Sequence, residues 1–259
     1  MYDAIKRFNH QFAYEPIIEN KSRLPTDVSR YIVAGMGGSH LAADLIISLR
    51  PLLDITVQAD YGLPVRSIGM EGTLVIASSY SGNTEETIDA LRATLVKGMS
   101  SAVIAAGGQL LEIAKKENIP YIQLPSVGIQ PRSALGYSIK AILALMKEDM
   151  LLKEASELAK ILDPSVREAK GAELSEKLEG RVPLVYASGR NAAIAYNWKI
   201  KLNETGKIPA FYNIFPELNH NEMTGFDTSS GISTLASRFS TILLSDDEDD
   251  PRIRIRMEV

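Results

Sequence analysis

Short apolar runs closed by small residues recur along the chain and alternate with segments that have helical periodicity. Such runs, without polar alternation, are typical of strands buried on both faces of a parallel sheet. The predicted strands are 31–34, 73–77, 102–106, 121–124, 183–187, 208–212 and 241–244. The predicted helices are 39–49, 84–97, 109–117, 132–149 and 191–204, with a charged helical stretch over 150–180. This alternation predicts an α/β fold with doubly wound parallel sheets.

The strand–helix pattern restarts after the charged helical stretch. We therefore expect two α/β halves, residues 1–152 and 153–259. In open α/β sheets, ligands bind outside the carboxyl ends of the strands. The turns that follow Ala34, Ala77 and Ala187 are therefore the places where chemistry is expected.

Composition and charge exclude several classes of protein. The chain is 45% hydrophobic and 23% charged, which is ordinary for a folded protein. Its formal net charge of −4 does not suit a general nucleic-acid binder, which needs a basic surface. It has no cysteine, which excludes disulfides, thiolate catalysis and Cys-type zinc sites. No His, Asp or Glu group has metal-ligand spacing, so we expect neither a metal nor a cofactor.

The chain also lacks the marks of export or membrane insertion. Its first residues have no apolar run after the basic positions, as a signal peptide would. No stretch approaches the roughly 18 apolar residues of a membrane span. We expect a cytoplasmic protein with no membrane contact.

The most informative turn is rich in hydroxyl groups. The predicted strand 73–77 is followed by the sequence SSYSGNTEET, where a helix is expected to begin. Hydroxyls of Ser79, Ser81 and Thr84 beside the free N–H groups of a helix start predict a cradle for a phosphate. The alternative is helix capping, because Asn83 and Glu86 have capping-box spacing. Capping needs one polar side chain, and the excess of hydroxyls favours the anion.

A glycine turn, GMGGSH, follows the first predicted strand. It suggests a dinucleotide fingerprint, but His40 stands where that fingerprint has its last glycine, and no acidic residue clearly ends a second strand. The glycines Gly37 and Gly38 also suit a close approach of the backbone to a sugar, with Ser39 as a hydrogen-bond donor. For His40 we expect a solvent-exposed or helix-capping position.

The second half carries a dense polar cluster. Glu204 lies near the end of the predicted helix 191–204, and the sequence ELNHNE at 217–222 has no regular periodicity. A carboxylate base, a histidine that opens a sugar ring and a cation at the enediolate oxygen would serve an aldose–ketose isomerisation. His220 and Arg132 are candidates for the last two roles. Spacing alone does not select these residues, since isolated Glu, His and Arg side chains are usually structural or solvated.

Taken together, these segments resemble the bifunctional phosphoglucose/phosphomannose isomerases, a branch of the sugar isomerase (SIS) superfamily. The resemblance rests on GMGGS at 35–39, SYSGNTEET at 79–87, PRSALGY at 131–137, LNE at 202–204 and ELNHNE at 217–222. The hydroxyl turn is common to many SIS proteins, whereas PRSALGY and ELNHN together are far more specific to this branch. The resemblance implies two flavodoxin-like or Rossmann-like SIS subdomains, over 1–152 and 153–259, the first binding phosphate and the second carrying catalytic residues.

The resemblance also implies roles for individual residues. Ser79, Ser81 and Thr84 would hold the phosphate, and Gly37, Gly38 and Ser39 would lie against the sugar. Arg132 would stabilise a cis-enediol intermediate, and Glu204 would move the proton between C1 and C2. His220 would assist ring opening, reaching in from the neighbouring subunit of a homodimer. The substrates would be glucose 6-phosphate or mannose 6-phosphate, interconverted with fructose 6-phosphate without a metal.

One departure qualifies the resemblance. Chains of this family continue past the segment that matches 251–253 into a further helix with a lysine that serves the sugar ring. Here the sequence ends at Val259, in a segment expected to be a strand, so we expect a second subdomain that is shortened and incomplete. A non-catalytic sugar-phosphate sensor therefore stays open as an alternative, as does an isomerase for another phosphosugar.

Overall fold

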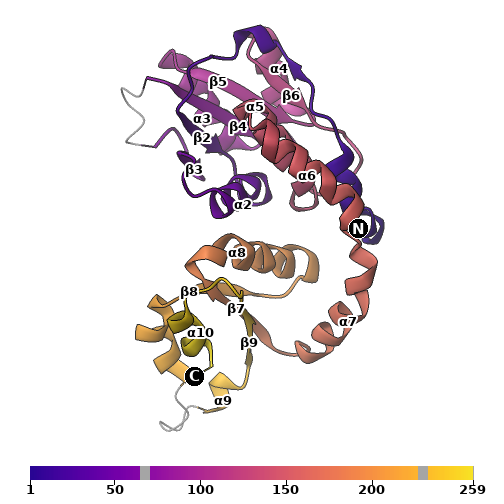
Figure 1. Ribbon diagram of the computed structural model, residues 1–259, viewed down its shortest axis with the longest axis vertical. Helices are drawn as coiled ribbons and strands as arrows, with labels where there is room; N and C mark the ends of the chain where they lie inside the picture. The colour runs from indigo at the N-terminus through magenta and orange to yellow at the C-terminus, as the bar shows by residue number, and fades with distance from the viewer. Residues whose placement is uncertain (65–70, 227–232, 259) are drawn as a thin grey trace. The chain divides into compact units, whose positions relative to one another are not determined.

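The computed structural model describes residues 1–64, 71–226 and 233–258. The chain forms two compact units, Met1–Val166 and Arg167–Val259, which we call unit 1 and unit 2 and describe separately (Figure 1). The division follows Val166 rather than lying near residue 152. Helix α6 (Asp149–Ile161) packs against the 3₁₀ helix η1 (Phe8–Ala13) and helix α5 (Leu135–Met146), which holds it in unit 1.

Unit 1 is built on a six-stranded sheet with the strand order β1-β6-β5-β4-β2-β3. Five strands are parallel, and the short edge strand β1 is antiparallel to β6. The strands are β1 (Ile18–Glu19), β2 (Arg30–Ala34), β3 (Ile55–Gln58), β4 (Thr73–Ser78), β5 (Ser100–Ala105) and β6 (Tyr121–Gln123). All six residues of the central strand β4 are buried, as expected for a strand covered on both faces.

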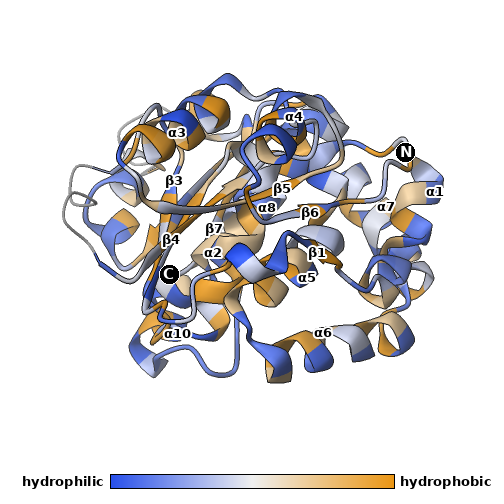
Figure 2. Ribbon diagram, turned by 90° about the horizontal axis from the view of Figure 1, so that it is seen from above, coloured by the Kyte–Doolittle hydropathy of each residue, from blue (hydrophilic) through white to orange (hydrophobic). Residues whose placement is uncertain are grey.

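Helices cover both faces of this sheet. Helices α3 and α4 lie on one face, and α2, α5 and α6 lie on the other (Figure 2). Leu91 of α3 and Leu110 of α4 belong to one buried cluster with Ala77 and Val103 of the sheet. The remaining bounds in this unit are α1 (Tyr2–Lys6), α2 (Leu41–Leu49), α3 (Glu85–Val96), α4 (Gly108–Lys116), η2 (Lys21–Arg23), η3 (Gly37–Ser39) and η5 (Pro131–Ser133), and η6 (Pro164–Arg167) contains the point of division. The doubly wound arrangement is confirmed.

Unit 2 has a parallel three-stranded sheet with the order β8-β7-β9. Successive residues of the central strand point to opposite faces. Tyr186 joins a cluster with Leu218, while Val185 joins one with Ala195 and Trp198 of α8. The elements are β7 (Val182–Ser188), β8 (Phe211–Phe215), β9 (Phe239–Leu244), α7 (Glu168–Lys177), η7 (Gly189–Asn191), α8 (Ala192–Lys201), the π-helix η8 (Leu202–Gly206), η9 (Glu217–His220), η10 (Glu222–Phe226), α9 (Ser233–Ala236) and α10 (Pro251–Met257).

Two predicted elements of unit 2 differ from the structure. The strand expected over 208–212 begins only at Phe211, because Pro209 has no N–H and the N–H of Ala210 donates to Asn203 Oδ1 at 2.7 Å. The strand expected at the end of the sequence is wrong, since Pro251–Met257 is helix α10. Its N-cap Asp250 accepts a hydrogen bond from the N–H of Arg252, and Pro251 occupies the first turn, where proline is favoured.

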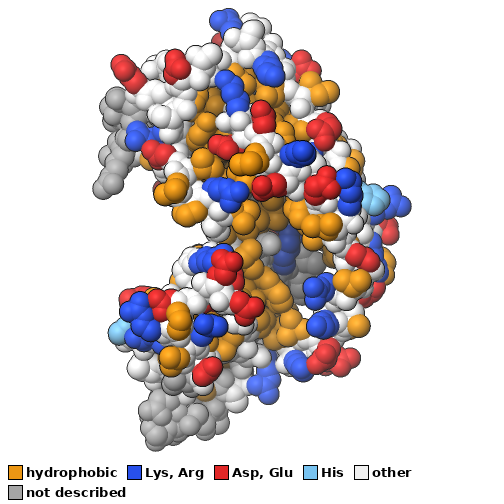
Figure 3. Space-filling model, viewed as in Figure 1, with side chains coloured by type: hydrophobic (Ala, Val, Ile, Leu, Met, Phe, Trp, Pro, Cys, Tyr) orange, Lys and Arg blue, Asp and Glu red, His pale blue; other side chains and the backbone are white. Residues whose placement is uncertain are grey.

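The surface and the helix lengths add two observations. On the face drawn in Figure 3, acidic and basic side chains are interspersed within each unit. Over residues 1–64, 71–226 and 233–258, none of the helices has the length and hydropathy that a bilayer span requires.

Candidate functional site

Two turns lie side by side at the carboxyl ends of neighbouring strands in unit 1. Strands β2 and β4 pair in parallel, with Ala34 opposite Ala77, so the turns that follow them leave the sheet together. The hydroxyl of Ser78 donates to the carbonyl oxygen of Ser39 at 3.1 Å. At Gly35 an added Cβ would lie only 2.7 Å from the carbonyl oxygen of Ser78, so the two backbones meet closely. The glycine turn and the hydroxyl turn (79–84) are therefore joined into one surface.

The three predicted phosphate-binding hydroxyls converge. The Oγ of Ser79 lies 2.7 Å from Oγ1 of Thr84 and 3.4 Å from Oγ of Ser81. Ser79 is buried, Ser81 is exposed and Thr84 is half-buried, so the cluster opens outward. Thr84 is the N-cap of α3, yet its side chain does not cap the helix. The first N–H groups of a helix have no partner within the helix, so this arrangement offers donors to an anion.

Asn83 does not form the capping box considered for the start of α3, where Thr84 is the N-cap. The Oδ1 of Asn83 accepts a hydrogen bond from the backbone N–H of Gln109 at 3.0 Å, at the start of α4. Asn83 therefore serves the next helix rather than the capping box that was considered for α3. The sequence could not show this, because Asn83 and Gln109 come together only through the packing of adjacent β–α turns.

The hydroxyl turn interlocks with the turn 106–109. The N–H of Ala106 donates to the carbonyl of Tyr80, and the N–H of Leu110 donates to the carbonyl of Gly82, both at 2.9 Å. Gly82 has φ +72°, and a Cβ there would lie 1.8 Å from the carbonyl oxygen of Gly107. Only glycine meets both requirements, so the shape of the hydroxyl turn is fixed from its far side.

Arg132 lies directly against the glycine turn. It is buried in η5, and a Cβ added at Gly38 would lie 2.7 Å from the Cα of Arg132 and 2.9 Å from its N. Unit 1 therefore brings one set of predicted residues together at the ends of β2 and β4. These residues are Gly37, Gly38, Ser39, Ser79, Ser81, Thr84 and Arg132.

A buried glutamine supports this arrangement and was not predicted. The Nε2 of Gln11 donates to the carbonyl of Ser133 at 2.6 Å, and its Oε1 accepts from the N–H of Gly136 at 2.9 Å. Gln11 thus spans the backbone on the carboxyl side of Arg132. The contact joins residues 122 positions apart, so no local pattern could have revealed it.

His40 occupies the N-cap position of α2, one of the two positions expected for it, but its side chain neither caps the helix nor is exposed. Its side chain is buried, and its Nδ1 lies 2.7 Å from Oδ2 of Asp44, one turn further along α2. The helix places residues four apart on the same face, which explains the pairing.

In unit 2, Glu204 lies within the short π-helix that ends α8. Its side chain is half-buried, and Lys207 closes the segment in a left-handed conformation. Single π-helical turns within α-helices are frequent at functional sites, and this one directly follows α8. This segment precedes β8 and so lies at the amino end of that strand.

His220 lies beyond the other end of the same strand. It is the last residue of η9, which follows the carboxyl end of β8, and it is exposed. The five residues of β8 span about 16 Å. Unit 2 therefore does not bring Glu204 and His220 together.

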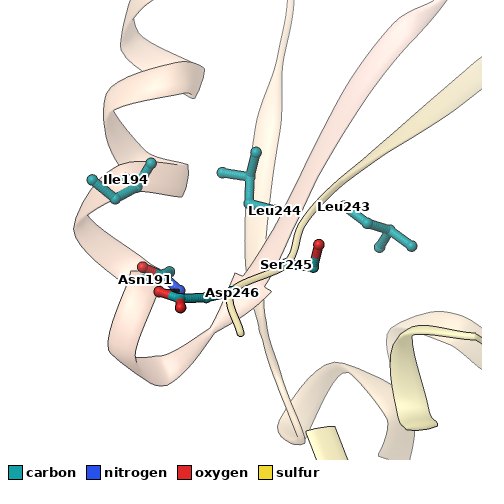
Figure 4. A pocket seen from close by; sticks show the side chains of 6 residues that line it. All are labelled: Asn191, Ile194, Leu243, Leu244, Ser245 and Asp246. Atoms are coloured by element: carbon teal, nitrogen blue, oxygen red, sulfur yellow. Dashed lines mark hydrogen bonds between the residues drawn. The ribbon is translucent and has the colours of Figure 1, made fainter. Parts of the chain in front are cut away.

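Two cavities lie away from the predicted residues. One of about 320 Å³ lies at the ends of β7 and β9, where the Nδ2 of Asn191 donates to Oδ2 of Asp246 at 3.2 Å (Figure 4). A second, of about 230 Å³, is lined mainly by apolar side chains of α2, α5 and α6. In the parts of the chain that the structure describes, no three His, Asp or Glu residues are grouped to hold a metal ion.

The chain is similar in sequence to known sugar phosphate isomerases. Residues 167–259, which are unit 2, match the bacterial phospho-glucose isomerase C-terminal SIS domain. The chain is 37% identical over 250 residues to a bifunctional phosphoglucose/phosphomannose isomerase of Caldicellulosiruptor bescii, covering 90% of this chain and 72% of that protein. It is 32% identical over 264 residues to an Aquifex aeolicus protein of the same name, covering 100% of this chain and 79% of the relative.

A solved structure shares the fold at low sequence identity. The C-terminal domain of glucosamine-fructose-6-phosphate aminotransferase from Francisella tularensis superposes with a TM-score of 0.65 at 16% identity. The match covers 100% of this chain and 84% of that one. At this identity the likeness bears on the fold alone.

Proposed function

This chain belongs to the bifunctional phosphoglucose/phosphomannose isomerase family, and we propose that it interconverts glucose 6-phosphate and mannose 6-phosphate with fructose 6-phosphate. Family membership makes it an aldose–ketose isomerase. The observation that carries the choice of substrate class is the convergence of Ser79, Ser81 and Thr84 at the start of α3, with Arg132 packed against the adjoining glycine turn.

The phosphate end of the substrate is assigned to the hydroxyl turn. The hydroxyls of Ser79, Ser81 and Thr84 and the N–H groups at the start of α3 donate to the phosphate oxygens, and the helix dipole favours the negative charge. Gly37 and Gly38 let the sugar lie close to the backbone, and Ser39 offers a hydroxyl to it. The direct backbone contact between Gly38 and Arg132 supports placing the arginine beside the sugar.

The chemical step is a proton transfer between adjacent carbons. Glu204 takes the proton from C2 of the open-chain aldose, and the C2–H electron pair forms a C1–C2 double bond while charge develops on the C1 oxygen. Arg132 stabilises this cis-enediolate through its permanent charge. Glu204 then returns the proton to C1 while the proton of the C2 hydroxyl passes to the C1 oxygen, and the ketose results. C2 is planar in the intermediate, so both epimers can enter and leave through it.

Ring opening is assigned to His220, acting from a neighbouring copy in a homodimer. A histidine titrates near neutral pH and so can move a proton to or from the ring oxygen. His220 lies at the opposite end of β8 from Glu204, which supports the proposal that the histidine acting with Glu204 comes from a second chain. We propose a cytoplasmic enzyme that needs neither metal nor cofactor and acts in hexose phosphate metabolism.

The decisive variant is Glu204→Gln. A coupled assay follows fructose 6-phosphate formed from each aldose. The substitution keeps the side chain's size but removes the base, and turnover should fall by about 10²–10⁴-fold. Glucitol 6-phosphate, which has no carbonyl, should bind the variant as it binds the parent in calorimetry.

The control is Glu179→Gln, the same change at an exposed position of unit 2. Parental turnover in Glu204→Gln would remove the proposed base. Binding of glucitol 6-phosphate by a parent protein that turns over neither aldose would instead favour the sensor alternative.

A further inference from the structure

Beside the His220 segment, the carboxylate of Glu222 is held at both of its oxygens. The hydroxyl of Tyr186 donates to Oε1 and the Nδ2 of Asn213 donates to Oε2, each at 2.5 Å. Tyr186 comes from β7 and Asn213 from β8, so two neighbouring strands converge on one carboxylate. We call Tyr186, Asn213 and Glu222 the Glu222 cluster.

The direction of these hydrogen bonds is fixed by the backbone. The Oδ1 of Asn213 accepts from the N–H of Ile214 at 2.8 Å, so the amide must turn its Nδ2 toward Glu222. Burial and the carboxylate of Glu222 both raise the pKa of Tyr186, so its phenol stays protonated and donates. Residue 222 must therefore accept one hydrogen bond from Tyr186 and one from Asn213, which a carboxylate does with its two oxygens.

The cluster is placed to control the segment that carries His220. Glu222 begins η10, one residue after the end of η9 and two positions beyond His220. Two residues before His220, Leu218 is fully buried in the cluster that also contains Tyr186 and Phe215. His220 itself is exposed, and the residues two positions away on each side, Leu218 and Glu222, are both anchored to side chains of the sheet.

We propose that Glu222 is a positioning residue for His220, acting through its hydrogen bonds to Tyr186 and Asn213. In the segment 217–226, Leu218, Met223 and Phe226 pack against the apolar cluster of unit 2, and Glu222 adds a polar anchor that sets the rotation of the segment. Loss of the carboxylate frees the segment to shift. A displacement of about 1 Å at an acid–base group can cost about 10²-fold in rate. The inference rests on the proposed role of His220 in ring opening.

The test reverses the polarity of one hydrogen bond. In Glu222→Gln the new amide can accept from Tyr186 but sets N–H groups against those of Asn213, and in Asn213→Asp two carboxylates face each other. Each single variant should lose about 10- to 100-fold in turnover of glucose 6-phosphate. In the double variant the amide introduced at position 222 donates to the carboxylate introduced at position 213, which still accepts from Ile214, so most of the turnover should return. Glu179→Gln is again the matched control.

A second cycle asks whether Glu222 acts through His220. Adding Glu222→Gln to His220→Ala should cause no further loss, because the positioned group is already absent. Tyr186→Phe removes one hydrogen bond without stranding a charge, and should lower turnover less than Glu222→Gln while keeping the fold. Circular dichroism melts establish that each variant is folded at the assay temperature.

The outcomes separate this inference from the function it rests on. Parental turnover in folded Tyr186→Phe and Glu222→Gln, alongside a loss in His220→Ala, would overturn the positioning role alone. A further loss of turnover when Glu222→Gln is added to His220→Ala would also overturn the positioning role. So would turnover in the double variant at 213 and 222 that is no higher than in either single variant. Parental turnover in His220→Ala would overturn the ring-opening role and the positioning role together.

Discussion

Replacing Gly38 by alanine should separate Arg132 from the glycine turn. The new Cβ would lie 2.7 Å from Cα and 2.9 Å from N of Arg132. Non-bonded carbon atoms rest about 3.5–4.0 Å apart, so the backbones of η3 and η5 must part by about 1 Å. The atoms in the way belong to backbone, so no side-chain rotation can relieve the clash. The φ of Gly38 is outside the left-handed region, so the effect is one of contact and not of backbone strain.

The expected result is a loss of turnover larger than the loss of stability implies. Displacing the arginine by about 1 Å should lower kcat by about 10²-fold. Overpacking should lower the free energy of unfolding by about 1–3 kcal/mol. The coupled assay measures the first quantity and urea denaturation the second. The control is Gly189→Ala, where the nearest heavy atom to an added Cβ is Ile214 Cγ2 at 4.0 Å. An unchanged kcat in folded Gly38→Ala would refute the reasoning.

Two further predictions concern stability. The Nζ of Lys140 is fully buried and donates hydrogen bonds to Phe12 O, Glu15 Oε1 and Ser156 Oγ. Lys140→Met should therefore lower the free energy of unfolding by about 3 kcal/mol, as measured by urea denaturation. The control Lys153→Met, at an exposed position, should leave it unchanged. An unaltered unfolding midpoint in Lys140→Met would contradict this. The pKa of Tyr186 is raised in the folded state, so its contribution is complete below the unfolded value of about 10 and is lost as the pH rises above it. Urea denaturation at a series of pH values above about 10 should show the parent losing stability with rising pH faster than Tyr186→Phe does. Parallel curves of stability against pH for the two proteins would count against a raised pKa of Tyr186.

The sheets were largely predictable from the sequence, because their central strands are buried on both faces. Strand β4 is an example, since all its residues are buried and its apolar run is continuous. Strand β1 has only two residues and β3 has four with mixed burial, so neither produces a run that stands out. Strand β1 is fixed by its pairing with β6, and β3 by its pairing with β2, at the two edges of the sheet.

The error at the end of the sequence has a specific cause. In Pro251–Met257, isoleucines alternate with arginines, and that period of two is the signal of a strand. The helix is set instead by Asp250 and Pro251, whose capping and first-turn geometry outweigh the alternation. Local start signals carried more information here than the pattern of hydrophobic positions.

The site was predictable in its local parts only. The hydroxyl turn could be recognised because strand, small residues and helix follow one another in sequence. Contacts between distant segments were beyond reach, as the approach of Gly38 to Arg132 and the support of Ser133 by Gln11 show. The placement of Glu204 and His220 at opposite ends of β8 likewise depends on where each lies relative to the strand, which spacing alone does not give.

The interlocked turns at 79–84 and 106–109 have a consequence for recognition. Because each turn is bonded to the other, its backbone is already restricted before any ligand arrives. An anion that enters therefore meets donors whose conformational freedom was lost when the chain folded, and little ordering remains to oppose its binding. Affinity for the phosphate of the proposed substrate should accordingly depend on the integrity of the turn 106–109 as well as on that of the hydroxyl turn.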